Sequence, residues 1–418
     1  MLCLVASWPG PLDAQRGGMF LGSPDDPAIA YATAPVSNVV DDLNRRLADG
    51  SARLTFDGRS GYLASALDAL ALPADSQLLL FSKASLQGRL IGPANPRALF
   101  FNDRVALGWV RDGDLLEVAA HDARAGVVFY TLEQRATTRP VFTREFRCLG
   151  CHVTGETLGV PGLLMFSATR DGDEDRHVKH VTTDHRSPVA ERFGGWFVTG
   201  QSGAATHLGN RVPALDGHPG GSLASVAGLF EPGGFPAASS DIAALLTFSH
   251  QTHLTNLLTR ASWEARAADP ALHPGATAVP GQSAMVDTLM RGVADEVVDY
   301  MLLVDEAPVP SPVRGRSGFA ERMSARGPRD RKGRSLFELD LDRRLLKYPC
   351  SYLIYSPAFD ALPPRAKAPI YERMWHVLAG EAREPRYRRL SLADRQAVVE
   401  ILEDTKPDLP AYFTAVTK

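Results

Sequence analysis

The chain has few cysteines, no long apolar run and no strong excess of charge. Its 418 residues include 4 cysteines, which is too few for a disulfide scaffold. No stretch approaches the roughly 18 consecutive apolar residues of a membrane-spanning helix, so we expect no membrane span in the mature chain. The formal net charge of −3 gives no electrostatic support for nucleic-acid binding. We therefore expect a soluble globular protein that binds no nucleic acid.

Two kinds of hydrophobic pattern divide the chain. Apolar residues at three- and four-residue spacing predict helices, whereas short runs of Val, Leu and aromatic residues predict strands. We predict an α+β protein with an antiparallel β-rich N-terminal part, followed by a mainly helical, loop-rich part. The predicted helices are 39–47, 61–72, 240–266, 285–304, 370–378 and 393–403, and the predicted strands are 77–82, 105–110, 115–121 and 127–132.

Two of the four cysteines stand three positions apart and are followed by histidine, in Cys148-Leu149-Gly150-Cys151-His152. Cys-X-X-Cys-His is the pattern of covalent haem attachment, in which two thiols add to the porphyrin vinyl groups and the histidine ligates the iron. For this composition, chance placement would produce the pattern on the order of once in a thousand chains. The motif therefore predicts one covalent haem c, with Cys148 and Cys151 attached and His152 as proximal iron ligand.

The cysteine pair also has three alternative interpretations: a zinc site, a redox-active dithiol and a structural disulfide. A zinc site would join Cys148 and Cys151 to His180 and His185, but the gap to His180 is about twice the usual spacing and His152 is left without a role. A thioredoxin-like dithiol needs a βαβ unit, and the sequence shows none at this place. A structural disulfide between the two cysteines is favoured least.

The residue on the other side of the iron decides the kind of haem protein. A second strong ligand makes an electron-transferring haem, whereas an open position allows peroxide or small-molecule chemistry. Our candidates for this distal position are His250, His185 and His207, in that order. His250 and His253 lie at i and i+3 on one face of the predicted helix 240–266.

Four further residues have a predicted role. Met165 is assigned to core packing, and Cys350 is expected to be a buried free thiol. Arg186 and Arg192 are candidates for pairing with the haem propionates, with ordinary surface charge as the alternative.

Several segments resemble a group of large, mostly uncharacterised bacterial proteins described as cytochrome c domain-containing. The likeness rests on the haem motif and on other segments along most of the chain. It implies haem c binding and electron transfer in the periplasm, without naming a reaction. The segments are RCLGCH at 147–152, TLGVPG at 157–162, DHRSP at 184–188, GGWFVTG at 194–200, HLGN at 207–210, NPRALFFNDRVALGWV at 95–110, HQT at 250–252 and YPCSYLIYS at 348–356.

The chain is expected to divide into five parts. Residues 1–24 read as a truncated signal peptide or a disordered terminus, and residues 25–140 as the β-rich domain. Residues 141–307 form the cytochrome c-like haem-binding region, in which a long segment with little periodic signal would wrap the haem. The Pro/Arg/Gly-rich residues 308–334 are expected to be a linker, and residues 335–418 a helical region.

The function expected from the motif is electron transfer between periplasmic redox partner proteins through a single haem. Two alternatives stay open. One is a peroxidase-like oxidoreductase with His250 or His185 as a distal acid or base. The other is a haem-based binding or sensing protein whose C-terminal helical region contacts a partner.

Overall fold

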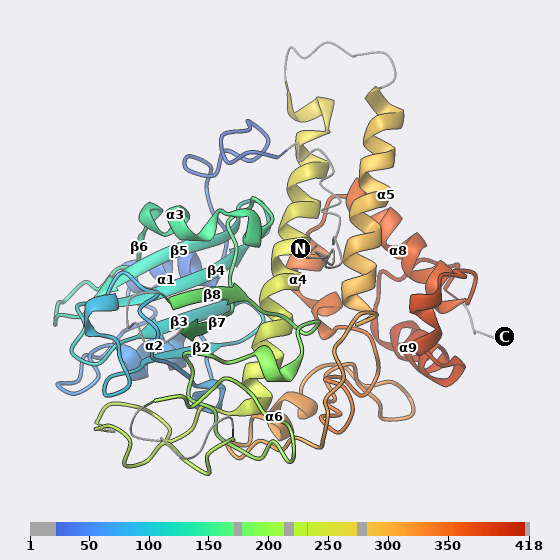
Figure 1. Cartoon of the computed structure of the whole chain (residues 1–418). Helices are drawn as coiled ribbons and strands as arrows, with labels where there is room; N and C mark the ends of the chain where they lie inside the picture. Colours follow the sequence, from blue (N-terminus) through green and yellow to red (C-terminus); the bar gives the residue numbers. More distant parts are fainter. Residues whose placement is uncertain (1–21, 171–177, 213–220, 232, 274–281, 414–418) are drawn as a thin grey trace, which may run out of the picture.

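The computed structural model describes residues 22–170, 178–212, 221–231, 233–273 and 282–413. It is an α+β protein, as predicted, with an antiparallel sheet in the N-terminal half and most of the helices in the C-terminal half. Figure 1 shows the sheet on one side, the C-terminal helices on the other and the long helix α4 between them. Helix α4 therefore joins the two halves.

The six-stranded sheet is a meander in which each strand pairs antiparallel with the next strand along the chain. The four predicted strands are confirmed as β1, β3, β4 and β5, whereas β2 and β6 were not expected from the sequence pattern. The bounds are β1 Leu78–Leu80, β2 Arg97–Phe101, β3 Val105–Trp109, β4 Leu115–Asp122, β5 Gly126–Glu133 and β6 Thr143–Arg144.

The two faces of the sheet have different neighbours. Strand β4 alternates between buried and half-buried residues, as expected for a strand with one face in the core. Its buried residues Leu116 and Val118 pack in one cluster with α1 (Val39–Ala48) and α2 (Leu63–Ala69). Glu117, between them, points to the opposite face, where its charge acts on Cys148 of the Cys-X-X-Cys-His motif.

The helices begin where the sequence provides capping side chains. Asp241 caps α4, accepting a hydrogen bond from the Ala243 N–H at 2.8 Å, and Ser391 caps α9. The predicted helices are confirmed, although α8 begins six residues before the expected 370. The bounds are α3 Leu149–His152, α4 Ile242–Ala267, α5 Gln282–Met301, α6 Phe319–Ala325, α7 Pro357–Asp360, α8 Pro364–Leu378 and α9 Leu392–Thr405.

The segment after the Cys-X-X-Cys-His motif contains a hairpin that was not expected. Strands β7 (Phe166–Arg170) and β8 (Val178–Thr182) pair antiparallel. His180, considered above as a zinc ligand, lies in β8 and is exposed. His177 lies outside the described residues. Met165, just before β7, is buried in the core as predicted.

The expected linker at 308–334 is packed against the rest of the protein. It contains α6, and Val309, Val313 and Phe319 lie in the same buried cluster as α4 and α5. Arg326 forms an ion pair with Asp103, next to strand β2, at 2.8 Å. These residues are therefore part of the core rather than an extended connection, while the proposed division into domains stays a prediction.

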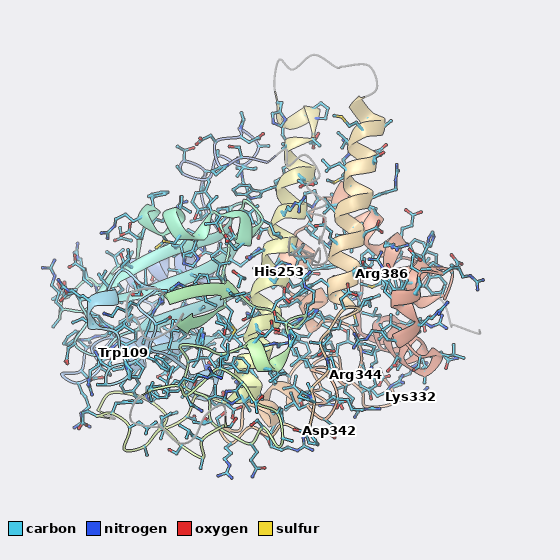
Figure 2. All side chains as sticks on the ribbon, viewed as in Figure 1. Trp109, His253, Lys332, Asp342, Arg344 and Arg386 are labelled. Atoms are coloured by element: carbon cyan, nitrogen blue, oxygen red, sulfur yellow. The ribbon has the colours of Figure 1, made fainter. Side chains whose placement is uncertain are left out.

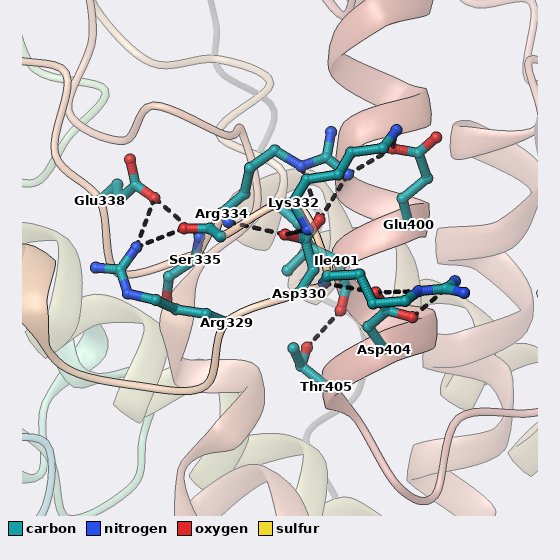
Figure 3. A network of polar contacts seen from close by, with 12 residues as sticks. Arg329, Asp330, Lys332, Arg334, Ser335, Glu338, Glu400, Ile401, Asp404 and Thr405 are labelled. Carbon is teal, nitrogen blue, oxygen red and sulfur yellow. Dashed lines mark hydrogen bonds and ion pairs between the residues drawn. The ribbon is translucent and has the colours of Figure 1, made fainter.

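A polar network joins the end of this segment to α9, as Figure 3 shows. Lys332 donates to the Glu400 carboxylate at 2.8 Å, and Arg331 donates to Asp404 at 2.9 Å. Arg334 bridges Asp330 and Glu400. The basic residues of this segment, which suggested a linker, thus form ion pairs with α9.

Candidate functional site

The two thiols of the motif lie on the short helix α3 and the turn before it. Glu145 caps this turn by accepting from the Arg147 N–H at 2.9 Å. Cys148 is half-buried, Cys151 is exposed, and both are free thiols. Residues at i and i+3 share one face of a helix. Both sulfur atoms are therefore available on one side of the turn.

His152 follows on the same helix, and its ring has a fixed orientation. Its Nδ1 lies 2.8 Å from the Gly162 carbonyl oxygen, and its ring packs on Phe129 with centroids 4.7 Å apart. Because a carbonyl only accepts, Nδ1 carries the proton and Nε2 is left with a lone pair. Burial lowers the pKa of His152, so the ring is neutral. No hydrogen bond joins Nε2 to another residue in the part of the chain that the structure describes.

Helix α4 holds the carbonyl that orients His152. The Asn256 side chain accepts from the Leu163 N–H at 2.9 Å and donates to the Leu163 carbonyl at 2.8 Å. The neighbouring Gly162 must lack a side chain, since a Cβ there would lie 2.3 Å from Asn256 Oδ1. Asn256 and Gly162 are thus second-layer groups of the kind that fix metal-ligating histidines. Neither role can be recognised from the sequence alone.

This arrangement makes a prediction for the Asn256→Asp variant. The carboxylate would place two acceptors against the Leu163 peptide, so the segment that bears the Gly162 carbonyl should shift. We expect the fraction of His152 in the Nδ1–H form to fall, as measured by ¹⁵N NMR of labelled histidine before haem attachment.

The matched control for this prediction is Asn210→Asp. Asn210 spans the Val198 peptide in the same way, accepting at 2.8 Å and donating at 2.9 Å. The control variant should leave the His152 tautomer unchanged. An unchanged tautomer in Asn256→Asp as well would show that Asn256 does not position the ring.

A half-buried ion pair lies close to the motif. Arg97 of β2 reaches over Gly108 to Glu117 of β4 at 2.8 Å, and a Cβ at Gly108 would collide with the guanidinium. Burial raises the pKa of the Cys148 thiol to about 11, and the negative charge of Glu117 adds to this effect. A reactive dithiol needs the opposite shift. The pair at 148 and 151 therefore lacks the electrostatics of a thioredoxin-like site.

The zinc alternative is not assembled in the structure. Among the described residues, no three or more His, Cys, Asp or Glu side chains form a group that could hold a metal ion. His185 contacts His250, with their Nδ1 atoms 2.7 Å apart, and His180 is exposed on β8.

The three histidines considered for the distal position fall into two places. His185 and His250 lie together in the interior, and His250 Nε2 is 2.7 Å from Ser351 Oγ. His207 lies elsewhere, with Nδ1 accepting from the Gly209 N–H and Nε2 close to Ser222 Oγ. Of these three rings, only His185 keeps a nitrogen, Nε2, without a hydrogen bond to any described residue. None of them is seen to contact His152.

Charged and aromatic groups surround the histidine pair. Tyr300 of α5 stacks on His185 with ring centroids 4.0 Å apart. Arg186 pairs with Asp184 and approaches His253, which lies midway along α4 in Figure 2. Burial lowers the pKa of His250 to about 3 and that of His253 to about 4. The histidines of α4 are therefore neutral at physiological pH.

The two arginines considered for haem propionates have partners of their own. Arg192 is buried and donates to the carbonyls of His185 and Ser187, while Arg186 is held by Asp184. The guanidinium whose charge acts on His152 is Arg97. This role could not be predicted from the sequence, because the register of strand β2, which was not predicted, brings Arg97 there.

The residues of the motif fit a covalent haem. Cys148 and Cys151 would form the thioether bonds, and the neutral Nε2 of His152 would ligate the iron. No protein-family model matches the chain, and searches of curated proteins and of solved structures find no match. The comparisons therefore give no support for a cytochrome c domain, and that resemblance stays a prediction. Within the described ranges, no helix combines the length and apolar character needed to cross a bilayer.

Proposed function

We propose that the chain is a c-type haem protein that passes single electrons between periplasmic partner proteins. The observation that supports this most is His152, a neutral ring with Nδ1 bound to Gly162 and Nε2 open, next to two free thiols. When bound, the haem would supply a one-electron iron couple. The polypeptide would hold and orient it and set its electrostatic surroundings.

Three groups of this chain would serve that role. The Gly162 carbonyl, held in place through Asn256, orients the imidazole and raises its basicity as a ligand. Phe129 packs on one side of the ring and excludes water there. The Arg97–Glu117 pair places a guanidinium and a carboxylate close to the motif.

The test is the protein expressed with a haem-attachment system in a periplasm. We expect a reversible titration of one electron per chain, and low-spin, six-coordinate spectra in both redox states. High-spin ferric haem that binds cyanide or reacts with peroxide would instead support the peroxidase-like alternative. The separate variants His185→Gln, His250→Gln and His207→Gln would show which ring, if any, is the sixth ligand. The proposal itself names only His152.

The binding or sensing alternative needs a test that leaves the core intact. Truncation near residue 310 would remove buried residues such as Val313 and Phe319, so a lost partner contact could merely reflect unfolding. Substitution of exposed residues on α8 or α9 is the better test. A variant that keeps its haem but loses a partner would support this alternative.

A further inference from the structure

A buried chain of hydrogen bonds ends on an atom without a partner. Ser351 Oγ lies 2.7 Å from His250 Nε2, and His250 Nδ1 lies 2.7 Å from His185 Nδ1. The last atom of the chain, His185 Nε2, is buried and forms no hydrogen bond to any described residue. A buried polar atom in this state calls for a partner.

The space beside that atom is large enough for one water. His185 lines a small cavity of about 10 Å³ together with Arg192 and Glu306, which is close to the smallest volume that holds a water molecule. Its polar lining supplies the hydrogen-bond partners that such a water needs. Glu306 is itself buried, and it accepts from the Leu345 N–H at 2.6 Å.

Glu306 connects this cavity with the solvent. It also lines an open pocket of about 390 Å³, whose other polar groups include Arg389, Asp394 and Arg344. In Figure 2, Arg344 lies among the loops below the lower end of α5. The Glu306 side chain thus lines both the open pocket and the cavity next to His185.

We propose that Glu306, one water in the cavity, His185 and His250 form a proton-uptake path that begins at the open pocket. The Glu306 carboxyl gives its proton to the water, and the water gives one of its own protons to His185 Nε2. His185 then releases its Nδ1 proton to His250 Nδ1, and the resulting imidazolium donates from Nε2 to Ser351 Oγ. The Glu306 carboxylate regains a proton from solvent.

At neutral pH the proton to be transferred lies on Glu306 and both rings are neutral, so the transfer is uphill and forms the His250 imidazolium only transiently, which is enough for hydrogen exchange. Burial raises the pKa of Glu306 to about 7, so the acid retains its proton. Burial also lowers the pKa of His185 well below its usual value, so the ring is neutral, and its Nε2, which has no hydrogen bond to any described residue, is the atom that receives the proton. The charged and titratable groups that face the path are Asp184, Arg186, Arg192, His253, Tyr300, Arg344 and Arg389.

The path is tested by hydrogen exchange at the rings of His185 and His250, followed by ¹⁵N NMR of labelled histidine. Glu306→Gln keeps the size of the side chain and an acceptor for the Leu345 N–H but removes the acid. We expect it to slow exchange of the ring N–H with water about tenfold or more, as loss of a positioned acid does in general. The matched control is Asp305→Asn, which changes the exposed neighbouring acid and should exchange like the unmodified protein.

A second variant tests the water. Val309 also lines the cavity, and Val309→Ile adds a methylene that should expel the water while leaving Glu306 in place. It too should slow the exchange, and it decides the matter if circular dichroism shows that Glu306→Gln fails to fold. Exchange at the unmodified rate in either folded variant would overturn the proposal. The test needs no haem, so its outcome is independent of the proposed electron transfer.

Discussion

The Cys148→Ala/Cys151→Ala variant should contain no covalently attached haem, whereas Cys350→Ala should attach haem like the unmodified protein. The thioether bonds can form only at free, reachable sulfur atoms. Cys148 is half-buried and Cys151 exposed, while Cys350 is fully buried and its pKa is raised to about 12 by burial. The measurement is the pyridine haemochrome spectrum of the purified protein after acid–acetone extraction, which removes haem that is not covalently bound.

The single variants refine this result. Cys148→Ala and Cys151→Ala each leave one sulfur atom next to His152, so each should attach less haem than the unmodified protein and hold it by one bond. Circular dichroism on Cys350→Ala shows whether loss of a buried thiol disturbs the fold. Covalent haem in the double variant at the level of the unmodified protein would contradict the assignment of the motif.

The protein should lose stability as the pH falls from 6.5 toward 4. His185, His250, His253 and His207 are neutral in the folded protein because burial lowers their pKa values, to about 3 for His250 and about 4 for His253 and His207. The unfolded chain binds protons at these residues below about pH 6.5. Stability is therefore fully present above pH 6.5 and is lost below it. Near pH 5, each such histidine contributes a slope of about 1.4 kcal/mol per pH unit.

Glu306 acts in the opposite direction over part of this range. Its pKa is raised to about 7 in the folded protein, so ionisation in the unfolded chain costs stability above about pH 4.5, and acidification relieves this cost. Burial also lowers the pKa values of His121 and His152, and it raises those of the carboxyl groups of Glu264 and Asp299. The net slope should still be positive, because these six histidines oppose three carboxyl groups.

Urea unfolding at several pH values measures this slope. The His250→Gln variant lacks one buried histidine. Its free energy of unfolding should therefore change less steeply with pH, by the contribution of one histidine, about 1.4 kcal/mol per pH unit. The control His376→Gln, at an exposed residue of α8, should keep the original slope. A free energy of unfolding that does not change between pH 7 and pH 5 would contradict the buried, neutral state of these rings.

Local patterns in the sequence were enough to predict much of the fold. The alternation in β4 and the turn residues between β3, β4 and β5 identify a meander, because strand pairs joined by short turns need no distant information. Capping residues locate the starts of two helices for the same reason: Ser240 or Asp241 for α4, of which the structure uses Asp241, and Ser391 for α9. The short strand β2 and the β7–β8 hairpin lack such strong patterns, and their pairing depends on distant contacts.

The candidate site was predictable only where its residues are contiguous. The motif at 148–152 can be recognised in the sequence because its two cysteines and its histidine lie within five consecutive residues. Asn256 and Arg97 act on His152 or its surroundings from helix α4 and strand β2, and their roles depend on tertiary packing. The sequence held no distinct signal for Asn256, because its neighbours on that face of α4, such as Thr252, His253 and Thr259, are polar as well. The pairing of His185 with His250 likewise joins residues 65 apart in the sequence.

The composition of residues 308–334 was misleading for a physical reason. Arginine, proline and glycine are common in exposed connections, but here the arginines meet carboxylates on other elements. Arg322 pairs with Asp75, and Arg334 pairs with Glu400. Charge complementarity between distant segments cannot be recognised from the composition of one segment.

The most direct test of the central claim is the intact mass of the unmodified protein, measured under denaturing conditions after expression with a haem-attachment system. The account predicts the mass of the polypeptide plus one haem, with the cysteines at 148 and 151 blocked to alkylation. The mass of the bare polypeptide, with both of these cysteines open to alkylation, would contradict it.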